Sequence, residues 1–190
     1  QVDEGRQAYI VCPLVEENEE MNLKSVTALA EKYKNEVFKD YRVEYLHGKM
    51  KNKEKDEIME RFKNGDIDIL ISTTVIEVGV NVPNASLMVV ENAERFGLAQ
   101  LHQLRGRVGR GEYQSYCILK YQGNSDVIRK RMKVMTDTND GFIISEKDLE
   151  LRGSGEFFGT RQHGLPEFKI ANLFEDMPVL KQVQALAINI

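Results

Sequence analysis

The sequence predicts an α/β fold in which a parallel β-sheet is flanked by helices, followed by a helical hairpin and a loop. First, short apolar runs alternate with longer stretches whose apolar residues recur at helical spacing. Second, residues 67–71 are apolar except for Asp68, as expected of a strand buried on both faces of a parallel sheet. Third, the pattern changes after about residue 122, where two amphipathic stretches precede a glycine-rich segment. We therefore expect one domain at residues 1–122 and a second part at 123–190.

Each element follows from its local sequence. Strands are expected at residues 8–12, 43–46, 67–71, 87–90 and 116–119, and helices at about 22–38, 52–64 and 98–105. Pro13 ends the first strand, and Asn64-Gly65 ends the second helix. In the second part, a basic helix is expected at 125–138. A further helix should start at a capping box formed by Ser145 and Asp148 and end near Arg152. A loop with four glycines, residues 153–164, then follows.

Composition limits the possible function classes. The 190 residues are 42% hydrophobic and 29% charged, which is typical of a soluble globular protein. No apolar run reaches the roughly 20 residues needed to span a bilayer, and no signal-peptide pattern is present, so we expect no membrane association and a cytoplasmic location. Cys12 and Cys117 lie in predicted buried strands and are expected to be reduced core residues, with no metal site. The net charge of −4 gives no general attraction to nucleic acid, so DNA binding would depend on local groups.

The two ends of the sequence suggest a segment of a longer polypeptide. The chain starts at Gln1 rather than at methionine, and it stops at Ile190 within an apolar helical pattern. In a parallel α/β fold with right-handed crossovers, the loops that follow the strands lie along one edge of the sheet, where ligands gather. Groups that bind phosphates are therefore expected along this edge.

An arginine-rich turn gives the most specific functional indication. It is the segment Gln103-Leu104-Arg105-Gly106-Arg107-Val108-Gly109-Arg110, at the end of the predicted helix 98–105. A glycine before each of Arg107 and Arg110 lets the backbone turn tightly, so both guanidiniums can project toward a shared anion. Arginine keeps its charge at any working pH, which suits a phosphoryl group whose charge rises in the transition state. Burial of both guanidiniums against the domain's own carboxylates would exclude this interpretation.

A second segment, residues 73–83, follows the strand expected at 67–71. Thr73 and Thr74 can cap a short helix whose free N–H groups favour a backbone phosphate. Gly79 allows close approach, and Asn81 offers hydrogen bonds to a sugar hydroxyl. Taken alone, the segment favours an ordinary strand-to-helix turn that ends in a loop with Pro83.

A third segment, His47-Gly48-Lys49, lies between the second predicted strand and the following helix. A small turn with these residues at a helix start can bind a phosphate without reading bases. An isolated His-Gly pair is usually just a turn, so this segment gains its meaning from its companions. Its position, before the threonine segment and the arginine turn, sets the order in which the three segments occur.

In that order, the three segments resemble motifs of superfamily 2 helicases, whose second RecA-like domain would then be the expected fold. The arginine turn resembles their last motif, in which arginines act as fingers on ATP bound by a partner domain. The resemblance implies that Arg107 and Arg110 are catalytic and that Gln103 orients groups around the γ-phosphate or couples it to DNA. No role for Arg105 is implied.

The same resemblance assigns roles to the other two segments. It implies that Thr73 and Thr74 contact the nucleic-acid backbone, and that Gly79 and Asn81 touch the nucleotide. Many members of the superfamily carry aspartate where this chain has Asn81. The turn His47-Gly48-Lys49 resembles a motif that contacts the DNA strand along which the helicase moves.

The C-terminal part narrows the resemblance to one family. The segment from Asp148 to Gly164 resembles the translocation motif of the RecG family of fork-reversal helicases, in which a hairpin tied together by arginines levers a loop along duplex DNA. The resemblance implies that Arg131 and Arg152 are the hairpin arginines and that Arg161 and Gln162 are loop residues. An arginine on each helix could bond the carbonyls of the other helix.

The resemblance also implies a cofactor and partners. No G-x-x-x-x-G-K-[ST] sequence and no acidic Walker B pair occurs, so ATP and Mg²⁺ are expected to be held mainly by the first RecA-like domain of the same polypeptide. The expected DNA partners are forks and Holliday junctions, bound by a monomer, and the chain alone should hydrolyse no ATP. Two alternatives stay open: the corresponding domain of a transcription-repair coupling translocase, and a non-enzymatic α/β nucleic-acid-binding module.

Overall fold

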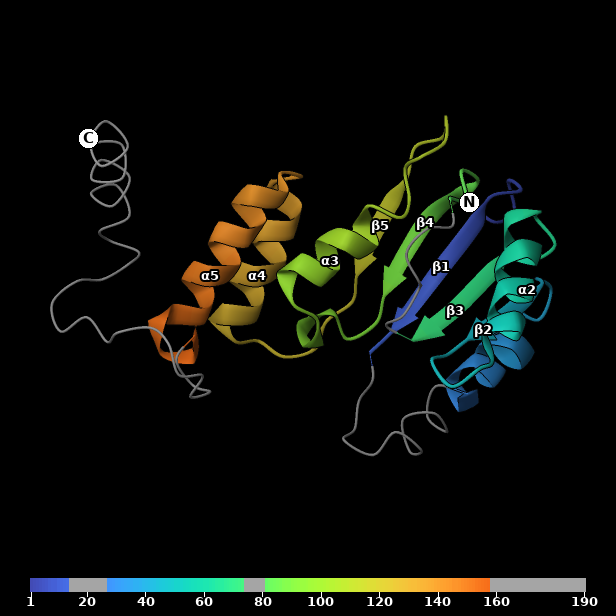
Figure 1. Ribbon diagram of the computed structural model, residues 1–190, viewed down its shortest axis with the longest axis horizontal. Helices are drawn as coiled ribbons and strands as arrows, with labels where there is room; N and C mark the ends of the chain where they lie inside the picture. The colour runs from blue at the N-terminus through green and yellow to red at the C-terminus, as the bar shows by residue number, and fades with distance from the viewer. Residues whose placement is uncertain (14–26, 74–80, 158–190) are drawn as a thin grey trace, which may run out of the picture. The chain divides into compact units, whose positions relative to one another are not determined.

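The computed structural model describes residues 1–13, 27–73 and 81–157. Within these residues, five strands form one parallel sheet in the order β2-β3-β1-β4-β5 (Figure 1). The strands are β1 (Gln7–Cys12), β2 (Val43–Leu46), β3 (Ile69–Thr73), β4 (Ala85–Val90) and β5 (Tyr116–Leu119). This arrangement confirms the predicted parallel sheet, with β2 and β5 as its edges.

The strand expected at residues 67–71 lies two residues later in the chain. Pairing with β1 starts only at Ile69, which lies opposite Ala8. Ile67 is buried, but its carbonyl accepts a hydrogen bond from the side chain of Gln7 at 2.7 Å rather than joining a ladder. The apolar pattern therefore predicted correctly that Ile67 is buried, but it placed the start of the paired strand two residues too early.

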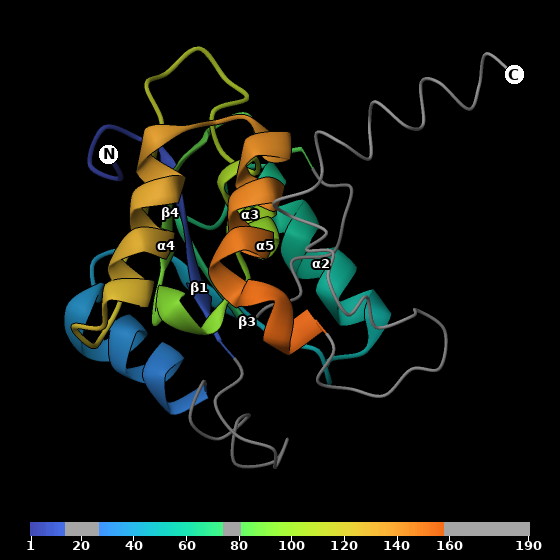
Figure 2. The same cartoon turned by 90° about the vertical axis from the view of Figure 1, so that its left-hand side faces the viewer.

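Helices lie on both faces of this sheet (Figure 2). Residues 27–32 are α-helical and continue as the π-helix η1 (Tyr33–Val37), which confirms that part of the helix expected at 22–38; residues 22–26 lie outside the described residues. The other helices are α2 (Asn52–Lys63), the short 3-10 helix η2 (Ala93–Arg95), α3 (Leu98–Arg105), α4 (Asp126–Asp137) and α5 (Gly141–Phe157). None of the described helices is both long enough and apolar enough to cross a bilayer.

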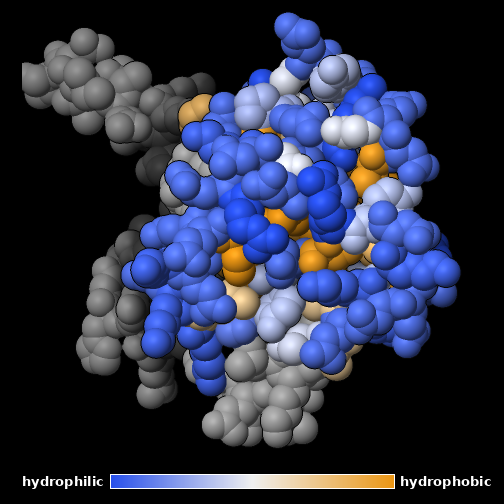
Figure 3. All heavy atoms as spheres, turned by 90° about the vertical axis from the view of Figure 1, so that its right-hand side faces the viewer, coloured by the Kyte–Doolittle hydropathy of each residue, from blue (hydrophilic) through white to orange (hydrophobic). Residues whose placement is uncertain are grey.

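Alternate residues of each strand point to opposite faces of the sheet. On one face, Ala8, Ile10 and Cys12 belong to a core that also contains Ala30 of the helix at 27–32. On the other face, Tyr9 packs edge-on against Phe62 of α2, with ring centroids 4.8 Å apart. The surface over α2 and β2 is mainly hydrophilic, with apolar side chains gathered toward its centre (Figure 3), as expected of an amphipathic helix.

We expect Phe62→Ala to lower the free energy of unfolding by about 3–5 kcal/mol, because it empties a fully buried aromatic site. The variant should remain folded but melt earlier than the parent chain. Chemical denaturation of both proteins measures the difference. A loss below about 1 kcal/mol would mean that α2 collapses onto the sheet and fills the space.

The C-terminal helices begin at side-chain caps. Ser125 caps α4, since its Oγ accepts from the backbone N–H of Ile128 at 3.2 Å. Asp140 caps α5, because its Oδ1 accepts from the N–H of Phe142 at 2.8 Å. The predicted capping box at Ser145 is therefore wrong: α5 starts at Gly141, and the hydroxyl of Ser145 donates to the carbonyl of Gly141 inside the helix.

The end of α5 also differs from the prediction. The helix continues past Arg152 to Phe157, so the first glycines of the expected loop, Gly153 and Gly155, have helical backbone. The chain forms two compact units, residues 1–145 and 146–190. The boundary expected at residues 122 and 123 stays a prediction.

Candidate nucleotide and nucleic-acid interface

The carboxyl ends of three neighbouring strands bring one group of predicted site residues together. Cys12 lies opposite Thr73, and Leu46 lies opposite Ser72, so His47 begins its turn beside the end of β3. Thr73 is only 2% exposed, so its side chain packs in the core. Gly48 and Lys49 are exposed at this edge.

His47 is half-buried and stacks on Tyr45, with ring centroids 6.0 Å apart. Burial lowers the pKa of His47, with a smaller opposing effect from Glu54. The imidazole is therefore neutral at pH 7 and could donate an N–H to a phosphate, but it adds no positive charge. Positive charge at this turn would have to come from Lys49.

Several predicted residues lie outside the described part of the chain. These are Thr74, Gly79, Arg161 and Gln162. Arg152 lies within α5, but only its backbone is described. Their predicted roles stay predictions.

The arginine turn, residues 106–111, follows α3 directly. Gly106 caps the helix, and the N–H of Arg107 donates to the carbonyl of Leu104 at 2.9 Å. Gly109 has a φ of 81°, a left-handed conformation that strongly favours glycine. Arg110 donates from Nε to the carbonyl of Gly106 at 3.0 Å, which holds its guanidinium over the turn. The predicted tight turn is therefore present, and glycine is needed at position 109.

The arginine turn lies against the chain that enters β4. A Cβ atom at Gly111 would overlap the carbonyl oxygen of Pro83, so the two backbones are in direct contact. Pro83 is two residues from Asn81, which is exposed. The turn and the end of the 73–83 segment are thus adjacent, at the amino end of β4. This places them apart from the carboxyl edge that carries Gly48 and Lys49.

We expect Gly111→Ala to lower ATP hydrolysis by the full-length protein about 100-fold, since the added methyl group must push the turn away from Pro83 by a fraction of an ångström or more. The fold should survive, because position 111 is exposed. Gly106→Ala is the matched control: its Cβ would lie 3.5 Å from the carbonyl of Gln103, an ordinary contact. Steady-state ATPase assays compare the two, and equal activities would show that this backbone contact does not position the arginines.

The charges of Arg107 and Arg110 both act on the electrostatics of Tyr9 in β1. Burial raises the pKa of Tyr9 to about 12, and the positive charges of Arg107 and Arg110 oppose that rise. Arg107 is half-buried and Arg110 is exposed. Within residues 1–13, 27–73 and 81–157, neither guanidinium forms an ion pair with a carboxylate. Burial of both guanidiniums against carboxylates of the same domain, which would have excluded a phosphate-binding role, is therefore not seen among the described residues.

Gln103 lies on α3, one helical turn before Arg107, and is exposed. The buried face of the same helix consists of Leu98, Leu101 and Leu104. Gln103 therefore points away from the core, on a helix fixed to the sheet by three leucines. Asn81 and Gln103 are both available to a ligand at the side of the molecule that carries the arginine turn.

Arg131 of α4 donates to two main-chain carbonyls that precede α3. Its Nη1 donates to Glu94 at 3.0 Å, and its Nη2 donates to Phe96. We had expected this arginine to bond the carbonyls of the other hairpin helix, and that prediction is wrong. The loop around η2 offers the carbonyls because Asn92 enters it with a φ of 48°, which turns the backbone sharply.

Arg105, for which the sequence implied no role, makes the reciprocal contact. From the last turn of α3, its Nη1 donates to the carbonyls of Met135 at 2.7 Å and Thr138 at 2.9 Å, at the C-terminal end of α4. The last carbonyls of a helix have no partner within the helix, so those of Met135 and Thr138 are free to accept from Arg105. The helix dipole also favours a cation at the C-terminal end of α4. Its Nη2 lies 3.0 Å from Nδ1 of His102. We call Arg105 and Arg131 together the arginine clamp.

Sequence patterns contain no signal for the arginine clamp, because all four acceptors are main-chain carbonyls. Arg105 could have been singled out only by its position immediately before the arginine turn. The clamp joins α4 to both ends of the α3 region. The helix that leads directly into the arginine turn is therefore tied to α4.

These features define the second of the two RecA-like domains of a helicase, which has an arginine turn and whose sequence contains no phosphate-binding loop. The chain belongs to the helicase conserved C-terminal domain family, whose model matches residues 1–112. The model for domain 3, C-terminal, of the ATP-dependent DNA helicase RecG matches residues 138–190. Within the family, the chain is therefore of the RecG type, as the sequence motifs had indicated.

Relatives agree with this assignment over almost the whole chain. The ATP-dependent DNA helicases RecG of Streptococcus pneumoniae and Bacillus subtilis are 52% and 49% identical to it, over 98% and 100% of its length. A solved structure of RecG bound to a three-way DNA junction is similar, with a TM-score of 0.70 and 47% identity over 95% of this chain and 23% of that chain. The chain spans 28% of the length of each of the two relatives.

Proposed function

We propose that this chain is the second motor domain of an ATP-dependent double-stranded DNA translocase that remodels stalled forks and branch-migrates Holliday junctions. The observation that carries the proposal is the tight turn after α3, which holds Arg107 and Arg110 three residues apart with no carboxylate partner among the described residues. Such a pair suits a triphosphate held by a facing domain. The names of the relatives support ATP-dependent helicase activity, and the junction-bound RecG structure supports branched DNA as the substrate.

On the nucleotide side, ATP with Mg²⁺ supplies the phosphoanhydride bond that is broken, and the first RecA-like domain of the same polypeptide holds both. Arg107 and Arg110 approach from this chain and stabilise the charge that develops on the transferred phosphoryl group. Asn81 and Gln103, exposed near the turn, donate hydrogen bonds to the nucleotide or its sugar. Gly79 belongs to the same proposal, as the position that allows close backbone approach.

On the DNA side, the carboxyl edge of the sheet contacts the phosphate backbone. Gly48 offers its backbone N–H, Lys49 its charge, and the neutral imidazole of His47 an N–H. The buried side chain of Thr73 supports the edge from the core, while Thr74 would contact a phosphate directly. Contacts of this kind hold the strand without reading its sequence.

The arginine clamp couples the two sides. Because Arg105 and Arg131 tie α4 to both ends of α3, a shift of the arginine turn toward ATP moves α4 with it. The chain then continues into α5, where Arg152 lies, and on to Arg161 and Gln162. In the proposal, this segment pushes on duplex DNA. We further propose that the protein works as a monomer in the bacterial cytoplasm.

The test compares the full-length protein with the isolated 190-residue chain. ATP hydrolysis by the full-length protein should be stimulated more by forked or four-way DNA than by linear duplex. The isolated chain should hydrolyse no ATP with any of these substrates, because its sequence has no phosphate-binding loop. Activity in the isolated chain would contradict the proposal. A full-length protein that is silent on forked DNA would favour a non-enzymatic binding module, and displacement of stalled RNA polymerase would favour the coupling translocase.

A further inference from the structure

The edge strand β5 is open in the described part of the molecule. It pairs with β4, and no other described strand lies on its outer side. The N–H of Lys120 donates to Val90 and its carbonyl accepts from Ala93, so Lys120 turns both groups inward. Since the direction alternates along a parallel strand, Cys117 and Leu119 turn their backbone groups outward. This edge can therefore pair with a further strand.

Large apolar side chains are exposed along this edge. Tyr116 and Ile118 are each 48% exposed, and they lie in register with Leu87 and Val89 on one face of the sheet. On the other face, Cys117 and Leu119 point toward α4. The sequence had predicted a buried strand around Cys117, and the thiol is in fact only half-buried. Contiguous apolar exposure of this kind marks interaction sites on folded proteins.

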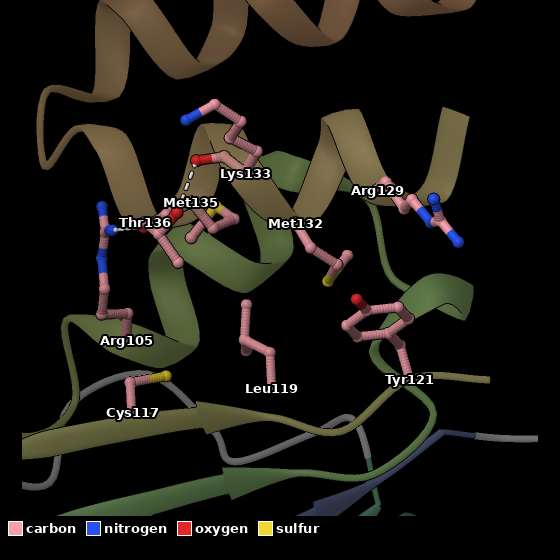
Figure 4. A pocket seen from close by; sticks show the side chains of 9 residues that line it. All are labelled: Arg105, Cys117, Leu119, Tyr121, Arg129, Met132, Lys133, Met135 and Thr136. Atoms are coloured by element: carbon pink, nitrogen blue, oxygen red, sulfur yellow. Dashed lines mark hydrogen bonds between the residues drawn. The ribbon is translucent and has the colours of Figure 1, made fainter. Parts of the chain in front are cut away.

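A groove of about 370 Å³ lies between β5 and α4, and we call it the β5–α4 groove (Figure 4). Its floor is apolar and its rim is cationic. The lining residues are Arg105, Cys117, Leu119, Tyr121, Arg129, Met132, Lys133, Met135 and Thr136. None of them is acidic. Figure 4 shows Leu119 and Met132 on opposite sides of the groove near its middle, with Arg105 and Arg129 at opposite ends.

The three cations of the rim differ in their availability. Arg105 is engaged by the carbonyls of α4, and Lys133 pairs with Asp137 at 2.9 Å on the surface. Arg129 is exposed and forms no ion pair with the residues described here. The rim therefore offers one uncompensated guanidinium and one lysine whose exposed ion pair is weak.

We propose that the β5–α4 groove docks an extended acidic segment of a partner protein, which adds to β5 as a sixth strand. The outward N–H and C=O groups of Cys117 and Leu119 would hold the backbone of the segment. Every second side chain of the segment would face α4: the apolar ones would enter the groove, and carboxylates on the same face would meet Arg129 and Lys133 at the rim. Strand addition of this kind takes affinity from main-chain bonds and specificity from the pockets beside the edge.

The observations favour this occupant over two others. A second copy of the chain would bring Arg129 and Lys133 against their own equivalents, which costs free energy. Single-stranded nucleic acid prefers rows of aromatic platforms beside cations, whereas the lining here holds a single aromatic residue, Tyr121, among two methionines, a leucine and a thiol. An open backbone edge is a feature that a peptide uses and a nucleic acid does not.

The test uses a fluorescent seven-residue peptide with glutamate at its first and last positions, leucine at its third and fifth, and threonine between them, so that leucines and glutamates share one face of the added strand. It is titrated into the 190-residue chain and into the full-length protein. Two matched peptides serve as controls: one with lysine in place of glutamate, and one N-methylated on the alternate amides that would face β5. We expect the glutamate peptide to bind about tenfold more tightly than either control. Arg129→Glu should weaken its binding about tenfold, while Lys63→Glu, an exposed substitution on α2, should leave it unchanged.

Four outcomes would overturn the proposal. The first is equal affinity for the glutamate and lysine peptides, and the second is insensitivity to N-methylation. The third is binding to the isolated chain but not to the full-length protein, which would assign the groove to another part of the same polypeptide. The fourth is failure to bind the peptide while the groove binds another ligand in a way that depends on Arg129. That ligand could be an oligonucleotide, or a second copy of the chain detected by sedimentation. Unchanged thermal melting of Arg129→Glu excludes unfolding as the cause of weaker binding.

Discussion

Replacing Arg107 with alanine in the full-length protein is expected to lower kcat for ATP hydrolysis about 10³- to 10⁵-fold, the effect of losing an arginine finger. The KM for ATP should change far less, because the guanidinium acts on charge that develops in the transition state. Thermal stability should stay close to that of the parent, since Arg107 has no described ion-pair partner to leave behind. Steady-state ATPase assays with forked DNA, together with melting curves, measure all three quantities.

Two controls make this result specific to the arginine turn. Arg107→Lys keeps the positive charge but loses the planar set of donors, so its activity should fall between those of the parent and the alanine variant. Arg61→Ala removes a surface arginine of α2 that pairs with Glu44 at 3.3 Å, and it should leave hydrolysis unchanged. Activity of the Arg107→Ala variant within tenfold of the parent would remove this residue from the catalytic proposal.

The second large effect is expected at the arginine clamp. Arg131→Ala removes hydrogen bonds to the carbonyls of Glu94 and Phe96, each worth about 1.5–3 kcal/mol because the donor is charged. We expect the variant to hydrolyse ATP within a few-fold of the parent, but to use about ten times more ATP for each base pair unwound. The reason is that α4 would no longer follow the movement of α3. Parallel assays of ATP consumption and fork unwinding measure this ratio.

The neighbouring residue Lys130 provides the matched control, because it is exposed on the same helix and Lys130→Ala should leave both assays unchanged. Arg105→Ala should reproduce the uncoupling. The double variant should be little worse than either single one, since both arginines hold the same pair of helices together. If Arg131→Ala lost hydrolysis and unwinding in equal proportion, the residue would support the fold and not the coupling.

Repeating patterns made most of the sheet predictable. The strand at 116–119 and the helix at 98–105 have the bounds that the sequence indicated, because apolar spacing and glycine stops mark them directly. The start of α5 was missed because two caps competed within six residues. Asp140 satisfies the first N–H groups of the helix, so Ser145 has no free helix end to cap.

The candidate site was predictable only where side chains carry the chemistry. The tight turn before Arg110 could be anticipated from its glycines, and Gly109 indeed has the left-handed backbone that they suggested. The contact between Gly111 and Pro83 was not predictable, because it joins two backbones far apart in the sequence. The same is true of the partners of Arg131, which depend on the packing of α4 beside the η2 loop.

Both arginines that join α3 to α4 end on peptide oxygens, and this decides what substitution can and cannot disturb. Glu94, Met135 and Thr138 present the same oxygen whatever side chain they carry, so drift at these positions should be nearly silent. Proline nearby, which reshapes the main chain, should be the damaging replacement. Among the residues of these contacts, only the two donors, Arg105 and Arg131, would then need a particular side chain for the proposed coupling of α3 to α4.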